Sequence, residues 1–153
     1  RTGSDAREFA LSNLTVFSQP HANTVSLTYQ EGGLTVVITY SLTDAGNNQA
    51  VVVARVTVTN TTSTPIQLNL FNYSDFDMES TSGGDQAELA RLGHIRVWET
   101  NSAHIATAET PLAWQIGAYP SVRNLLTNTT IDNMNNSGSP FGPGDFTGAL
   151  QWQ

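Results

Sequence analysis

The sequence predicts an all-β protein, an antiparallel β-sandwich of about eight strands, and two neighbouring segments carry most of that prediction. Residues 34–42 and 52–60 alternate apolar and polar side chains along their length. A period of two residues is typical of strands with one buried face. The stretch between them, 44–48, reads DAGNN and is rich in turn formers. The two segments are therefore expected to form an antiparallel hairpin.

The remaining elements are predicted from shorter patterns of the same kind. Strands are expected at about 8–17, 24–30, 34–42, 51–60, 65–76, 93–100, 103–108 and 145–153. Two stretches favour short helices, 84–92 with Asp85 as its cap and 121–126 with Ser121 as its cap. The polar segment 128–144 is expected to be a loop.

Length and composition bound the class of protein. A chain of 153 residues is predicted to fold as one β-sandwich domain over 1–153. The net charge of -7 argues against nucleic acid and anionic membranes as partners. The absence of cysteine excludes disulfides, thiolate metal sites and thiol catalysis. No apolar run reaches the roughly 18 residues of a membrane span, so none is expected.

The chain ends and the overall composition favour an exported protein. Low charge together with abundant Thr, Asn, Ser and Gly is typical of bacterial surface proteins. The sequence starts without Met, and residues 146–152 end it in an apolar alternation. Both termini are therefore expected to be cut or processed ends of a longer precursor.

Four short segments resemble one family of secreted proteins. They are 56–61 (VTVTNT), 70–77 (LFNYSDFD), 148–152 (GALQW) and the opening, which runs from RTG at 1–3 to REFAL at 7–11. Together they resemble secreted bacterial proteins of the exosortase-sorted (PEP-CTERM-like) kind, which are mostly uncharacterised. The resemblance implies an extracellular β-sandwich.

A group of acidic residues near the centre of the chain is the first candidate for a functional site. Asp75, Asp77 and Glu79 are spaced by two residues, and Asp85 follows after a Ser/Thr/Gly loop. Carboxylate oxygens in such a group suit calcium, although the spacing is not that of a helix-loop-helix site. The alternative is a solvated strand end with an Asp-rich turn.

Catalytic and transition-metal chemistry find weaker support in the sequence. His94 and His104 could face each other across a hairpin, with Glu99 and Glu109 nearby, as in a two-histidine, one-carboxylate site. The alternative is that both are ordinary surface or packing residues. Nothing places two carboxylates across a cleft for glycoside hydrolysis, and no Gly-x-Ser-x-Gly elbow supports a serine triad. We therefore predict no catalytic residues and no enzymatic activity.

Aromatic side chains offer a candidate sugar platform. Trp98, Trp114 and Tyr119 are the predicted glycan-binding residues, because flat rings stack on pyranose rings, and Phe141 and Trp152 are further aromatic candidates. Trp98 alternates with Val97 and should lie opposite the core face. The alternative is that these rings fill the sandwich core. Asn-x-Ser/Thr sequons occur at Asn13, Asn60, Asn72, Asn128 and Asn135 and would accept glycans only in a eukaryotic secretory pathway.

The edges of the expected sheets suggest the leading function. Sheet edges are normally guarded by lysine, proline or bulges, and this chain contains no lysine. Terminal strands could complete a neighbouring subunit, which makes Arg1, Leu150 and Trp152 the predicted assembly residues. We predict an extracellular, non-enzymatic structural subunit that self-associates into an oligomer or filament. No cofactor is expected for such a subunit. The competing prediction is a surface glycan-binding module, for which calcium is the one candidate cofactor.

Overall fold

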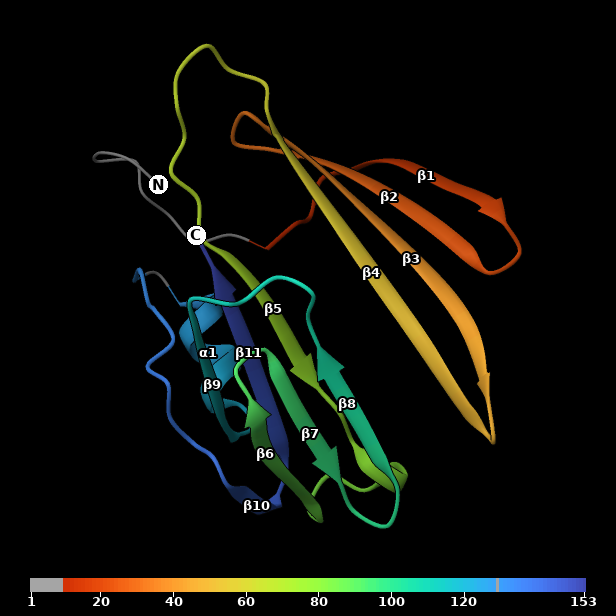
Figure 1. Ribbon diagram of the computed structural model, residues 1–153. Helices are drawn as coiled ribbons and strands as arrows, with labels where there is room; N and C mark the ends of the chain where they lie inside the picture. Colours follow the sequence, from red (N-terminus) through yellow and green to blue (C-terminus); the bar gives the residue numbers. More distant parts are fainter. Residues whose placement is uncertain (1–9, 129) are drawn as a thin grey trace. The chain divides into compact units, whose positions relative to one another are not determined.

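The computed structural model describes residues 10–128 and 130–153, and these residues are all-β (Figure 1). They form eleven antiparallel strands and one short α-helix, so the predicted class is confirmed with more strands than the eight expected. The described chain divides into two compact units, 10–66 and 67–153. A single domain over 1–153 stays a prediction.

The unit of residues 10–66 is a four-stranded antiparallel meander. Its strands lie in the order β1-β2-β3-β4, and each pairs with the next one along the chain. Their bounds are β1 (Leu14–His21), β2 (Thr24–Glu31), β3 (Leu34–Gly46) and β4 (Gln49–Asn60). Since consecutive strands pair, β1 and β4 are the two edges of this sheet.

The alternation seen in the sequence sets the two faces of this sheet. Ile38 of β3 lies opposite both Leu27 of β2 and Val56 of β4, and Phe17 of β1 lies opposite Leu27. Directly opposite residues project to the same side, so one face carries an apolar row across all four strands. The other face is rich in threonine, for example where Thr35 lies opposite Thr59.

The hairpin predicted between residues 42 and 52 is confirmed, with a tighter turn than expected. β3 continues to Gly46, and only Asn47 and Asn48 separate it from Gln49, the first residue of β4. Both asparagines have positive φ, at 54° and 58°. Two left-handed residues form the turn that matches the twist of paired strands, and asparagine tolerates this conformation.

The unit of residues 67–153 contains two sheets. The first has the order β10-β6-β7-β8 and the second the order β5-β11-β9. The bounds of these strands are β5 (Leu70–Asp75), β6 (Asp85–Arg91), β7 (His94–Trp98), β8 (Ser102–Ala106), β9 (Ala113–Ala118), β10 (Phe141–Gly144) and β11 (Phe146–Trp152). A 3₁₀ turn, η2 (Met78–Ser80), follows β5, and a helix, α1 (Ser121–Thr127), follows β9.

The two sheets pack face to face around one core, which makes this unit a sandwich. Buried Ala87, Ile95 and Val97 come from the first sheet, and buried Ile116, Phe146 and Leu150 come from the second. Across the second sheet, Ala113 and Ala149 pack with Val122 of α1 and with Met134. β11 is therefore buried on both faces, which explains why six of its seven residues are fully buried.

The predicted helix over 84–92 is wrong, because this segment forms β6. Ala87 is fully buried and lies opposite Val97 of β7, while Gln86 points to the exposed side. The residues favour a helix intrinsically, but pairing with β7 and burial in the sandwich determine the outcome. Asp85 is not a cap, and Ser121 begins α1 without capping it, since its hydroxyl donates to the Ala118 carbonyl at 2.6 Å.

Other expected elements also differ from the structure, and the strand predicted over 65–76 begins only at Leu70. The start of the strand predicted over 8–17 lies partly outside the described residues, and β1 begins at Leu14. The predicted loop over 128–144 contains β10, whose Pro143 is tolerated because β10 is an edge strand. β9 was not predicted, because six residues that include Gly117 carry too little periodicity. No helix of the described chain is long and apolar enough to cross a membrane.

Candidate functional site

The outer edge of β4 is the longest free strand edge in the described residues. β4 spans twelve residues, whereas the edge strands of the other two sheets, β5, β8, β9 and β10, span four to six. Its sequence, QAVVVARVTVTN, contains no proline, glycine or lysine. Figure 1 shows β4 at one margin of its sheet and β1 at the other. An uninterrupted edge of this length is a template for a further strand.

The hydrogen-bond phase of the sheet fixes which residues of β4 face outward. The Thr61 amide donates to the Gly33 carbonyl at 2.9 Å, and the Leu42 amide donates to the Asn23 carbonyl at 2.9 Å. Bonded and non-bonded pairs alternate along an antiparallel ladder. The odd-numbered residues of β4 therefore bond to β3, and the even-numbered ones direct their N–H and C=O groups outward. The outward-facing residues are Ala50, Val52, Ala54, Val56, Val58 and Asn60.

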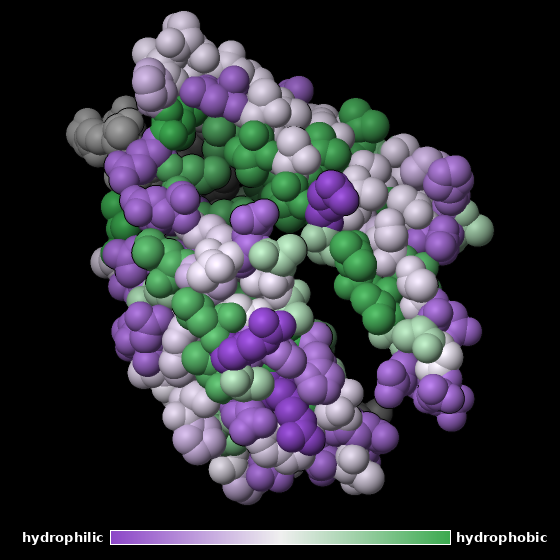
Figure 2. Space-filling model, in the orientation of Figure 1, coloured by the Kyte–Doolittle hydropathy of each residue, from purple (hydrophilic) through white to green (hydrophobic). Residues whose placement is uncertain are grey.

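The side chains of β4 are exposed almost along the whole strand. Val58 is half-buried and every other residue of β4 is exposed, including Val52 at 63% and Val56 at 40%. Arg55 is the one charged residue of the strand and lies on the threonine-rich face. Figure 2 shows apolar side chains at the surface of the sheet formed by β1–β4. Sequence reasoning expected these valines to be buried.

The opposite edge of the same sheet is interrupted. β1 contains Pro20, and its pairing with β2 shifts register between Leu14 and Val16 and again between Ser18 and His21. Proline and bulges are two of the features that protect an edge from adding a strand. The unguarded edge of this sheet is therefore β4.

Two of the three predicted assembly residues do not lie on a free edge. Leu150 and Trp152 belong to β11, the central strand of its sheet, which pairs with β5 on one side and β9 on the other. Leu150 is buried in the sandwich core, and the Trp152 indole donates to the Glu109 carbonyl at 3.2 Å. Arg1 lies outside the described residues. Strand addition is thus available at β4 rather than at the C-terminal strand.

Two of the predicted calcium ligands meet a third carboxylate that sequence reasoning missed. Oxygen atoms of Asp75, Asp77 and Asp145 lie within 4.8 Å of one another. Asp145 is distant in sequence and comes next to Asp75 because β11 pairs with β5. Partial burial, followed by the negative charges of Asp75 and Asp77, raises the pKa of Asp145. Burial and the hydrogen bond from its hydroxyl to Asp75, 3.0 Å long, raise the pKa of Tyr73.

The other two predicted ligands hold the backbone instead. Glu79 accepts hydrogen bonds from the amide and the side chain of Asn101 at 2.8 and 2.7 Å. Asp85 is fully buried and accepts from the Met78 amide at 3.0 Å and from the Phe146 amide at 3.5 Å. These bonds tie η2 and the start of β11 to β6.

The two histidines meet as the sequence predicted. His94 Nε2 and His104 Nδ1 lie 3.0 Å apart across the β7–β8 pair. Burial, and then the neighbouring His104 and Arg91, lower the pKa of His94. No third metal-ligating side chain joins them in the described part of the chain. Glu99 accepts instead from the Thr81 hydroxyl at 2.9 Å.

The aromatic candidates do not form one platform. Trp114, Phe141 and Trp152 pack against the core of the sandwich. Trp98 lies on the outer face of its sheet, as predicted, with the Arg96 guanidinium 4.8 Å from its ring centre. Tyr119 directly follows β9, a strand of the other sheet, and is exposed beside Arg123. Of these five candidates, the half-buried Trp98 and the exposed Tyr119 therefore reach the surface, each as a single ring.

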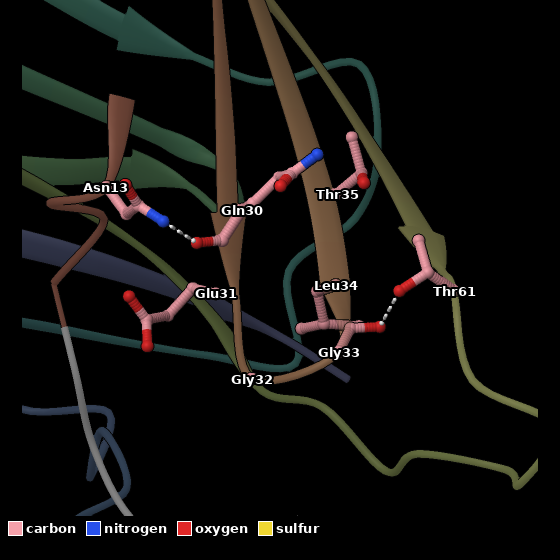
Figure 3. A pocket seen from close by; sticks show the side chains of 8 residues that line it. All are labelled: Asn13, Gln30, Glu31, Gly32, Gly33, Leu34, Thr35 and Thr61. Atoms are coloured by element: carbon pink, nitrogen blue, oxygen red, sulfur yellow. Dashed lines mark hydrogen bonds between the residues drawn. The ribbon is translucent and has the colours of Figure 1, made fainter. Parts of the chain in front are cut away.

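A hollow of about 490 Å³ lies at the β2–β3 turn (Figure 3). The Asn13 side chain donates to the Gln30 carbonyl, and the Thr61 hydroxyl donates to the Gly33 carbonyl, at 3.0 and 2.8 Å. Glu31 is the one titratable residue in its lining. Acid–base catalysis normally uses paired titratable groups, so the lining is poor in the groups that catalysis needs.

Comparisons with known proteins identified no relative of this chain. Protein-family models, curated proteins and solved structures were each searched, and none matches the chain.

Proposed function

We propose that this protein is an extracellular, non-enzymatic structural subunit of a surface layer, matrix or filament, and that it self-associates by β-strand addition at β4. The observation that carries the proposal is the edge itself. Twelve residues are exposed or half-buried, the even-numbered ones direct their N–H and C=O groups outward, and no proline or lysine interrupts them.

The expected location is supported by the composition of the chain. Few charges, no lysine, no cysteine and abundant Thr, Asn, Ser and Gly favour an exported protein. The resemblance of 56–61 and 70–77 to exosortase-sorted proteins points in the same direction. An extracellular position would suit a module whose working surface is a sheet margin.

Blocking the outward amides of β4 tests the proposal. Ala54→Pro removes an outward N–H while leaving the bonds to β3 in place, because the odd-numbered residues form those bonds. Sedimentation velocity over a dilution series should show association of the unsubstituted protein and its loss in Ala54→Pro. The matched control is Phe17→Pro, at an outward-facing position of β1, which should leave association unchanged. A monomeric unsubstituted protein at high concentration would refute the proposal.

A second candidate function, calcium-dependent glycan binding, is favoured by one observation. Three carboxylates, Asp75, Asp77 and Asp145, converge within 4.8 Å. Thermal unfolding with and without calcium tests the cation, and a glycan array then tests the sugar. Calcium should raise the unfolding temperature, and Asp145→Asn should abolish the rise. No calcium effect and no sugar signal would eliminate this candidate.

A further inference from the structure

We infer that the strand added to β4 is β4 of a second copy of this chain, antiparallel to the first and related by a two-fold axis that lies midway between the two Ala54 residues. This inference rests on the proposed self-association and specifies its partner, direction and register. Three properties of β4 lead to it, namely the two faces of its sheet, the phase of its hydrogen bonds and the position of its one charge.

The faces of the sheet determine the direction of pairing. A two-fold axis perpendicular to the sheet makes the two β4 strands antiparallel and keeps each apolar face beside the apolar face of the other copy. A parallel pair would need an axis along the strands, which would place the apolar face of one copy beside the threonine-rich face of the other. Val52 and Val56 are exposed on the apolar face, so the antiparallel pair covers them with each other.

The hydrogen-bond phase restricts the register. Only the even-numbered residues of β4 direct N–H and C=O groups outward, so an added strand must oppose even-numbered residues to even-numbered residues. One residue of β4 must therefore lie directly opposite its own copy, with the two-fold axis midway between them. The axes nearest the middle of β4 lie level with Val53, Ala54 or Arg55.

The charge and the length of β4 choose among these three axes. An axis at Arg55 opposes two guanidinium groups directly, which is unfavourable across strands. An axis at Val53 pairs residues 49–57, whereas an axis at Ala54 pairs residues 49–59. With the axis at Ala54, Arg55 lies opposite Val53 of the second copy, and Val56 lies opposite Val52. This register gives the longest pairing without a like-charge contact.

The other edge of the sheet is a poorer partner for β4. A head-to-tail contact would join β4 to β1 of the next copy. β1 is eight residues long, contains Pro20 and breaks register twice. Fewer ladder bonds could form there, so the β4–β4 contact is favoured.

Single cysteines introduced into this cysteine-free chain test the register. Across a hydrogen-bonded pair the Cα atoms are about 5.5 Å apart, within the span of a disulfide. Ala54→Cys should therefore form a disulfide-linked dimer under mild oxidation. Val52→Cys is the matched control on the same face, because its thiols would be about 14 Å apart, four residues along the strand. Maleimide labelling of each reduced variant checks that the thiols are equally accessible.

The outcomes separate this inference from the proposed function. Preferential cross-linking of Ala54→Cys over Val52→Cys, Val53→Cys and Arg55→Cys would support it. Preferential cross-linking of Val53→Cys or Arg55→Cys would overturn the register. Association of the unsubstituted protein without cross-linking of any variant would overturn the β4–β4 pairing and leave self-association standing. A protein that is monomeric throughout would remove both.

Discussion

Several polar residues of this chain act on its backbone rather than on a ligand. Gln151 is buried, accepts a hydrogen bond from the Met134 amide at 2.8 Å and donates one to Asn133 at 2.7 Å. Asp85 likewise anchors the amides of Met78 and Phe146. A buried polar side chain with backbone partners is stabilising because its removal leaves those partners unsatisfied.

We predict that Asp85→Ala destabilises the protein strongly. The substitution leaves the Met78 and Phe146 amides without their acceptor inside a fully buried site. The expected loss is about 1–3 kcal/mol of the free energy of unfolding, measured by urea denaturation. Glu109→Ala, which removes an exposed carboxylate, is the control and should have little effect. Equal stability of the two variants would show that Asp85 does not anchor this region.

Asp145 predicts a pH dependence of stability. Its raised pKa means that the fold favours the protonated carboxyl, because burial and neighbouring carboxylates oppose its charge. The stabilisation from protonation is present at acidic pH and lost as the pH rises through the raised pKa. Asp145→Asn should therefore be more stable than the unsubstituted protein at about pH 7 and equally stable near about pH 3. Urea midpoints across this range check the prediction, and a difference independent of pH would contradict it.

Among the elements, the β3–β4 turn requires positive φ at two adjacent residues that are not glycine. Asn47 and Asn48 both have positive φ, which side chains branched at Cβ adopt poorly. Asn48→Val should lower the free energy of unfolding by about 1–2 kcal/mol, whereas Asn48→Gly should not. Thermal unfolding of the two variants measures the difference. Equal midpoints would show that the turn rearranges freely.

The strands predicted best are those with a long alternation of apolar and polar residues. The alternation in 34–42 and 52–60 identified β3 and β4, because each strand presents one apolar and one polar face. The segment 84–92 was predicted as a helix because its residues favour helices, while its burial depends on pairing with β7. β10 has no alternation of its own and exists because it pairs with β6.

The sequence predicted that the site would be a free sheet edge but not which strand forms that edge. The absence of lysine indicated unguarded edges, but sequence alone does not determine which strand lies at the margin of a sheet. The pairing order identifies β4 as an edge and places Leu150 in a central strand. Asp145 joined Asp75 through pairing of β11 with β5, a contact between residues far apart in sequence.

For the whole molecule, association at β4 should protect backbone amides in an alternating pattern. In dilute solution the odd-numbered amides of β4 should exchange slowly, because they bond to β3, and the even-numbered ones should exchange fast. At high concentration the amides of Val52, Ala54 and Val56 should become protected as well. Hydrogen exchange followed by NMR at two concentrations measures this. Uniform protection of β4 at both concentrations would contradict edge association.

The two edges of the four-stranded sheet also predict how far assembly proceeds through strand addition. A β4–β4 contact about a two-fold axis uses one edge of each copy and leaves only β1 for growth, where Pro20 and two register shifts interrupt the ladder. Strand addition at β4 should therefore take the 16.5 kDa chain to twice its mass and no further, which sedimentation equilibrium measures, and growth of these dimers into a layer, matrix or filament would need a further contact. Pro20→Thr restores an amide to β1 and should add larger species, whereas Pro20→Thr combined with Ala54→Pro should not form the β4-linked pair. Continuous growth of the unsubstituted protein would show that a second, unguarded surface drives polymerisation.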